Sequence, residues 1–216
     1  MSRIIDLIAM QGVDIDTAYL ILALPFIATL ITVFRQVVGI KSFGIYTPLV
    51  LTFAFWATGL KYGLAIFTVI LVTGTVVRYS LKSLKLLYLP RMAIVITAIS
   101  VATLITLTIG GSMSRTGLSS TPILAILILI TLIEKFISTQ VEKGIRTATL
   151  LSIETLIIST VGYYFIIWDK FREFVLNYPE YIIFLFIINV FLGRWTGLRI
   201  SEYLRFKNVY KNTENE

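Results

Sequence analysis

Long apolar runs alternate with short polar segments along the whole chain, and seven such runs can be drawn. A membrane-spanning helix needs about 20 apolar residues, with a range of roughly 17–25. The first, third, fourth and sixth runs meet this length, whereas the second and fifth are marginal. The runs cover residues 17–34, 43–60, 62–78, 92–109, 122–137, 145–168 and 179–193. The pattern predicts an all-α polytopic membrane protein with seven transmembrane helices.

Prolines support the boundaries of these runs. Pro48, Pro90, Pro122 and Pro179 lie at or near the start of a run, where a missing backbone N–H costs little. Pro25 lies inside the first run, and we expect it to kink that helix as an ordinary tolerated membrane proline.

A repeat is visible in the order of the runs. The step Thr47-Pro48 recurs as Thr121-Pro122. In both copies a short apolar run, a glycine and a long apolar run follow. With three crossings per copy, the two copies insert in opposite directions, as in many secondary transporters. Shared membrane composition with a chance Thr-Pro match is the alternative.

The repeat defines the expected domains. We predict repeat units at about 17–79 and 91–168, then a last helix at 179–193, which gives a 3+3 inverted repeat plus one C-terminal helix. The transmembrane domain as a whole covers residues 17–206. Residues 1–16 form an extracytoplasmic segment, and residues 207–216 form a cytoplasmic tail.

The positive charges give an orientation. Of the 19 Lys and Arg residues, 14 fall in the segments that follow the first, third, fifth and seventh runs. Cytoplasmic loops carry the excess of Lys and Arg. The rule places the N-terminus outside and the C-terminus in the cytoplasm. It also favours full crossings by the two marginal runs over re-entrant loops.

Composition agrees with a lipid environment. The chain is 57% hydrophobic and 14% charged, against about 45–50% and 25% in soluble domains. It has no Cys and no His, which excludes thiol and imidazole chemistry. No phosphate-binding loop, metal-ligand set or hydrolytic triad is present. We expect no enzyme, cofactor or metal. The net charge is +7, and the basic residues lie between the apolar runs. This distribution argues against a nucleic-acid partner.

Glu154 is the most informative single residue, because it lies well inside the sixth run. A carboxylate at that depth costs at least about 2.5–3.5 kcal/mol unless it is paired or hydrated. It is a candidate proton- or cation-binding group. The alternative is a structural glutamate that is protonated or hydrogen-bonded to Thr73 or Thr75. The Thr47-Pro48 and Thr121-Pro122 steps are further intramembrane candidates.

A basic stripe follows the third run. Arg78, Lys82 and Lys85 are spaced i, i+4, i+7 and share one helical face, and Arg91 comes soon after. The stripe is interpreted as a topology anchor that contacts anionic lipid headgroups, or as a docking patch for a cytoplasmic partner or an acidic polymer. The same two interpretations apply to Arg194 and Arg199.

Asp14 and Asp16 form a pair of carboxylates before the first run. Acidic side chains are favourable at a helix N-terminus. We interpret the pair as caps of the first helix.

Three blocks of sequence resemble a known family. They are GIKSFGIYTPLVL, VVRYSLKSLKLLYLPRMAIVIT and GRWTGLRISEYLRF. The chain is similar, over about residues 17–206, to the seven-transmembrane domain often found fused to inactive transglutaminase-like domains. Its first half more distantly resembles the small membrane subunit of poly-γ-glutamate capsule synthesis.

The resemblance implies a bacterial inner-membrane protein encoded beside ATP-grasp ligases of the glutamate-ligase type. It implies a non-enzymatic component that docks such a ligase and helps to pass an anionic product. The sequence departs from the fused form, since we expect only a short N-terminal segment before the spans and no transglutaminase-like domain. A stand-alone secondary transporter with Glu154 as its coupling carboxylate is the alternative. Expected partners are membrane lipids and the ligase, with a homo-oligomer left open.

Overall fold

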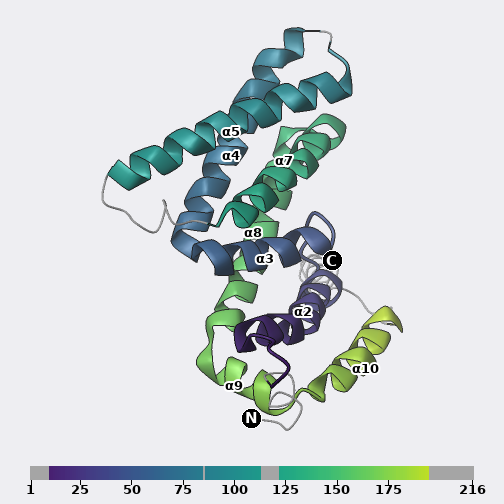
Figure 1. Ribbon diagram of the computed structural model, residues 1–216. Helices are drawn as coiled ribbons and strands as arrows, with labels where there is room; N and C mark the ends of the chain where they lie inside the picture. The colour runs from purple at the N-terminus through teal and green to yellow at the C-terminus, as the bar shows by residue number, and fades with distance from the viewer. Residues whose placement is uncertain (1–9, 85, 113–121, 195–216) are drawn as a thin grey trace, which may run out of the picture. The chain divides into compact units, whose positions relative to one another are not determined.

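The computed structural model describes residues 10–84, 86–112 and 122–194, and every regular element in these ranges is a helix (Figure 1). The elements are α2 (Ile15–Val33), η1 (Phe34–Val38, a π-helix), α3 (Tyr46–Thr58), α4 (Leu60–Ser80), η2 (Leu81–Ser83, a 3₁₀ turn), α5 (Tyr88–Ser112), α7 (Ile123–Lys143), α8 (Ile145–Ile167), α9 (Asp169–Asn177) and α10 (Tyr181–Arg194). The all-α prediction is confirmed.

Five of the described helices are long and apolar enough to cross a membrane. A sixth span results if α9 and α10, which meet at a bend of 102°, count as one. With 13 residues, α3 is only about 20 Å long and falls short of a hydrocarbon core of about 30 Å. The membrane class is confirmed, while the count of seven crossings stays a prediction.

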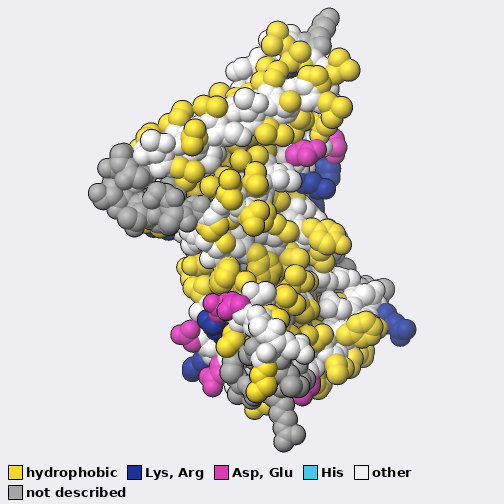
Figure 2. All heavy atoms as spheres, viewed as in Figure 1, with side chains coloured by type: hydrophobic (Ala, Val, Ile, Leu, Met, Phe, Trp, Pro, Cys, Tyr) yellow, Lys and Arg dark blue, Asp and Glu magenta, His cyan; other side chains and the backbone are white. Residues whose placement is uncertain are grey.

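The surface of the molecule explains why lipid must surround it. Hydrophobic side chains cover most of the face shown in Figure 2. On α10 the side chains of Phe184, Phe186 and Phe191 are 69–72% exposed. Apolar patches of this extent are not stable in water on a monomeric protein. The outer surface is therefore built for contact with acyl chains.

The fifth apolar run differs from its prediction. It was expected to end at residue 137 and to place Lys135 in a loop, but α7 continues to Lys143. The reason is a continued helical stripe. Ile133, Ile137 and Gln140 are buried at spacings of three and four, while Lys135 is exposed on the opposite face. As a result α7 has 21 residues and is long enough to span.

The helix α9 has no counterpart in the predicted runs. Its sequence is mostly polar, but Phe171, Val175 and Leu176 are buried along one face. The Phe171 ring lies 4.5 Å from that of Phe26 and 6.5 Å from that of Tyr19, both on α2. These aromatic contacts hold a short amphipathic helix that charge content alone would assign to a loop.

By spatial contact the chain divides into two compact units. The terminal unit comprises Met1–Leu49 and Tyr164–Glu216, and the central unit comprises Val50–Tyr163. Each is described by itself below. The division does not follow the two predicted repeat units, so the inverted repeat stays a prediction.

In the terminal unit, α2 begins as its sequence suggests and continues through Pro25 as one helix. Asp14 caps the helix by accepting a hydrogen bond from the Thr17 N–H at 3.3 Å, which confirms the predicted cap for this carboxylate. Asp16 has another role and pairs with Arg172 of α9. Near Pro25, the Tyr181 hydroxyl of α10 donates to the Leu22 carbonyl. A side chain distant in sequence thus binds a carbonyl in the turn before the proline.

In the central unit, α4 packs against both α5 and α7 (Figure 1). The contact is close at Gly74, where an added Cβ would lie 2.9 Å from Ile133 of α7 and 3.4 Å from Ile99 of α5. Small residues allow such approach between membrane helices. The fully buried Ile70 extends this contact and gives the unit a tightly packed centre.

Two pairs of helices are joined by one glycine each. Gly59 separates α3 from α4 with φ 75°, and Gly144 separates α7 from α8 with φ 84°. Only glycine adopts such angles without strain. The order of short run, glycine and long run predicted for each repeat copy is therefore present at Gly59, while at Gly144 the first helix is as long as 21 residues.

Candidate functional site

Three positive side chains of the central unit meet around one cavity. Arg78 lies in the last turn of α4, Lys82 lies in η2, and Arg91 lies near the start of α5. The cavity has a volume of about 560 Å³. We call it the cationic pocket. It is lined by Thr75, Arg78, Tyr79, Lys82, Arg91, Gln140, Val141, Gly144 and Ile145.

The turn between α4 and α5 brings these cations together. The α-helix tightens into the 3₁₀ turn of η2, whose Leu81 is buried and whose carbonyl accepts the Leu84 N–H at 3.1 Å. Arg91 then donates from Nη2 to the Leu86 carbonyl at 2.8 Å. This bond fixes the Arg91 guanidinium against the connecting segment, on the side where α4 ends.

Arg78 is held by a neutral side chain. Its Nη1 donates to Gln140 Oε1 at 2.6 Å and its Nη2 to the Gln140 backbone carbonyl at 3.3 Å. Gln140 is only 2% exposed, and its Nε2 donates to Thr75 Oγ1 at 3.4 Å. An amide orients the guanidinium as a carboxylate would, but leaves its charge uncompensated.

The electrostatics of the pocket are accordingly one-sided. None of the described lining residues is acidic, and Arg91 acts on Arg78 as a like charge. The carboxylates on the nearby helix α7 lie outside the lining, where Glu134 accepts from the Tyr88 hydroxyl at 3.3 Å. Guanidinium and ammonium groups in such a setting bind carboxylate or phosphate oxygens.

One atom of the cluster is itself unsatisfied. The Nε of Arg91 is buried and has no hydrogen-bond partner within the described chain. Buried donors are paired in the large majority of cases, and an unpaired one costs about 1–3 kcal/mol. An unpaired donor on Arg91 therefore adds to the positive charge of the cluster that lines the pocket.

The role of the predicted basic stripe stays a prediction, and the structure shows only where its residues lie. Arg78, Lys82 and Arg91 share the pocket, whereas Lys85 and Arg199 lie outside the described residues. Arg194 is exposed at the end of α10 in the terminal unit, which is described separately.

The Thr-Pro steps do not line the pocket. Thr47 and Pro48 are buried in the first turn of α3. Pro122 caps the start of α7 in an extended conformation and is exposed, and Thr121 lies outside the described residues. Thr47, Pro48 and Pro122 all lie at the start of a helix.

Glu154 lies on α8, half-buried, with its Oε2 buried and without a hydrogen-bond partner in the described ranges. The suggested bond to Thr75 is not formed, because that hydroxyl donates to the Leu71 carbonyl at 2.8 Å and accepts from Gln140. Glu154 is also absent from the lining of the cationic pocket. It stays an isolated intramembrane carboxylate.

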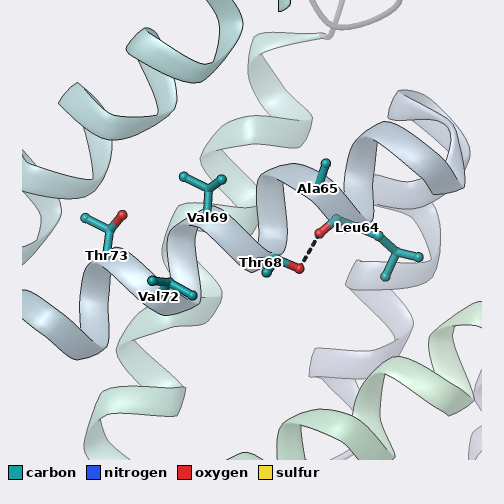
Figure 3. Close-up of a pocket in the computed structure, with 6 residues that line it drawn as sticks. All are labelled: Leu64, Ala65, Thr68, Val69, Val72 and Thr73. Atoms are coloured by element: carbon teal, nitrogen blue, oxygen red, sulfur yellow. Dashed lines mark hydrogen bonds between the residues drawn. The ribbon is translucent and has the colours of Figure 1, made fainter.

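A second hollow lies along α4, away from the charges. Its volume is about 490 Å³, and all the lining residues in Figure 3 come from this one helix. The Thr68 hydroxyl donates to the Leu64 carbonyl at 2.8 Å, drawn as the dashed line in Figure 3. The other lining side chains are Leu64, Ala65, Val69, Val72 and Thr73, so the hollow is mostly apolar.

Sequence reasoning missed Gln140 and considered Thr75 only as a partner of Glu154, not as part of this pocket. A signal for Gln140 was available, since it continues the buried stripe of Ile133 and Ile137. A polar residue on the core-facing side of a helix requires a partner. The partner itself, an arginine 62 positions earlier, could not be read from the pattern.

The family profile described as seven transmembrane helices usually fused to an inactive transglutaminase matches residues 7–210. The chain belongs to this family. Membership in the seven-transmembrane transglutaminase-associated family confirms the resemblance drawn from the three sequence blocks and the assignment of the chain to a membrane. No curated protein and no solved structure matches the chain.

Proposed function

We propose that the chain is a non-enzymatic membrane component of a peptide-ligase or poly-amino-acid system. It docks a cytoplasmic ATP-grasp or amide ligase and receives the anionic product of that ligase at the cationic pocket. The cluster of Arg78, Lys82 and Arg91 around a cavity without a lining carboxylate carries the proposal. An amide-linked product that retains free carboxylates has the complementary chemistry.

The setting of the proposal is the bacterial inner membrane, with the N-terminus outside and the C-terminus in the cytoplasm. In that orientation the connection from α4 to α5, which carries Lys82, faces the cytoplasm, where a ligase is accessible. The distant resemblance of the first half to a poly-γ-glutamate capsule subunit supports the choice of a polyanionic product. A homo-oligomer is compatible with this role.

The product-binding part is tested with the purified chain and a fluorescent oligoglutamate peptide. Fluorescence anisotropy should show saturable binding, weakened about tenfold in Arg78→Gln because a charge-assisted contact contributes about 1.5–3 kcal/mol. Arg172→Gln, which removes an arginine from the terminal unit, is the matched control and should bind as the wild type does. Equal binding by all three proteins would remove the proposal.

The docking part is tested by co-purification of the tagged chain with a cytoplasmic ATP-grasp ligase of the glutamate-ligase type. The double charge reversal Lys82→Glu, Lys85→Glu should release the ligase. Lys61→Glu reverses an exposed charge at the other end of α4 and should retain it. Retention by both variants would exclude docking at the basic stripe.

A stand-alone secondary transporter is the second candidate, and one observation favours it. The Glu154 Oε2 is buried and unpartnered, as expected of a group that binds and releases a proton or cation. In proteoliposomes without a ligase, a pH gradient should then drive uptake that Glu154→Gln abolishes. Uptake that persists in Glu154→Gln would exclude this role for the carboxylate.

A further inference from the structure

The cationic pocket continues into an apolar groove. A further cavity, different from the hollow of Figure 3, has a volume of about 360 Å³ and shares Thr75 with the pocket. It also shares Thr68 and Val72 with the hollow of Figure 3. We call this further cavity the acyl groove. It is lined by Thr68, Leu71, Val72, Thr75, Val76, Phe136, Thr149, Ser152, Ile153 and Leu156, from α4, α7 and α8.

We propose that the cationic pocket and the acyl groove form one binding site for an anionic lipid. The headgroup phosphate lies against Arg78, Lys82 and Arg91, and one acyl chain lies in the groove. The proposal rests on the anion-binding pocket of the proposed function and names the class of ligand that the pocket takes.

The groove is chemically apolar although four hydroxyl side chains line it. Each hydroxyl donates to a carbonyl of its own helix. Thr68 donates to Leu64, Thr75 to Leu71, Thr149 to Ile145, and Ser152 to Ala148, at 2.8–3.0 Å. No donor is thereby left to bind a hydrophilic ligand, whereas Phe136 and the aliphatic residues offer contact to hydrocarbon.

The dimensions and the opening also fit an acyl chain. Thr68 and Arg78 are ten positions apart on α4, which corresponds to about 15 Å along the helix. Val72, Val76 and Ile153 line the groove and are 54–58% exposed. In a membrane these exposed side chains face lipid tails, so a chain enters the groove sideways from the bilayer.

A water-soluble anion alone does not account for this arrangement. It would use the cations but leave the adjoining groove without a role, because a soluble anion has no alkyl chain to place there. An uncharged lipid would use only the groove. The two features together select a ligand with a phosphate at one end and an alkyl chain at the other.

The test uses the full chain in vesicles that contain a photoactivatable phosphatidylglycerol, with phosphatidylcholine of the same tails as the comparison probe. We expect stronger crosslinking of phosphatidylglycerol, and a drop of about fivefold in Lys82→Gln, since each cation near an anionic surface contributes about 1 kcal/mol. Lys61→Gln is the matched control and should crosslink as the wild type does. Equal crosslinking of the two lipids overturns the proposal.

A groove variant separates this proposal from the proposed function. Val72→Trp fills the acyl groove from its exposed edge and should reduce phosphatidylglycerol crosslinking while oligoglutamate binding is unchanged. Val72→Ala, which keeps the groove open, should behave as the wild type and controls for folding. If Val72→Trp crosslinks normally and inorganic phosphate competes fully, the site takes free anions only and the lipid proposal fails while the proposed function stands.

Discussion

Arg172 of the terminal unit and Arg78 of the central unit show two different uses of an arginine. Arg172 pairs with the Asp16 carboxylate, lies about half exposed, and also stacks over the Tyr19 ring at 5.6 Å. Arg78 is bound by the amide of Gln140, beside Arg91. The first arginine has its charge neutralised within the fold and joins α9 to α2. The second is held in one orientation without an acidic partner, so its positive charge remains available to bind an anionic ligand.

The largest expected difference between the two arginines is their side of the membrane. With Ser83→Cys or Lys170→Cys as the single thiol in a chain without native Cys, an impermeant maleimide should label position 170 in intact cells. Position 83 should react only after the membrane is broken. Labelling of position 83 in intact cells would reverse the predicted orientation and move the cationic pocket to the outside.

Gln140→Glu should abolish the difference between the arginines. It places a carboxylate against Arg78, so the central unit gains the kind of pair that Arg172 already has. Because an ionised partner competes directly with the ligand, we expect anion binding to fall about 10- to 100-fold. Titration with the oligoglutamate peptide measures this. If Gln140→Glu binds the peptide as tightly as the wild type does, the unneutralised charge of Arg78 does not contribute to anion binding.

Arg91→Gln should have a smaller effect than Gln140→Glu. It removes one of three cations and the unpartnered Nε, but leaves Arg78 and Lys82 in place. We expect anion binding to weaken about fivefold to tenfold, with a weaker salt dependence, because fewer charges are screened. Binding measured at low and high salt tests both parts. An unchanged salt dependence contradicts a direct role for Arg91.

Asp16→Asn should have the smallest effect. The pair with Arg172 is exposed, and such pairs contribute about 0.2–1 kcal/mol. We expect a slight loss of thermal stability and no change in anion binding, measured by a melting curve and by the same titration. A loss of anion binding in Asp16→Asn would show that the two arginines do not differ in function.

The sequence was sufficient to predict the apolar helices and most of their boundaries, but not the end of α7. The runs at 145–168 and 62–78 appear as α8 and α4 with boundaries shifted by only a few residues. The predicted end of α7 is too early because Lys135 counts as a loop residue in the prediction, although it lies on the exposed face of a continuing helix. A charged side chain needs contact with water or lipid headgroups, and a helix can provide this contact on one exposed face without ending.

The sequence predicted the charged residues of the site but not the side chains from other segments that contact them. Helical spacing places Arg78 and Lys82 on one face, but only the tertiary turn adds Arg91, and only packing of α7 on α4 adds Gln140. In the terminal unit, the bond from Tyr181 to the Leu22 carbonyl is likewise a contact between distant segments. Local periodicity carries no information on such pairings.

The single-residue joint at Gly59 has a consequence for biogenesis. A 13-residue helix is too short to partition into lipid by itself. Because a single glycine connects it to α4, the two helices cannot move far apart. We therefore expect α3 and α4 to leave the translocon together as a hairpin, so that a nascent chain halted before α4 emerges would keep α3 outside the hydrocarbon.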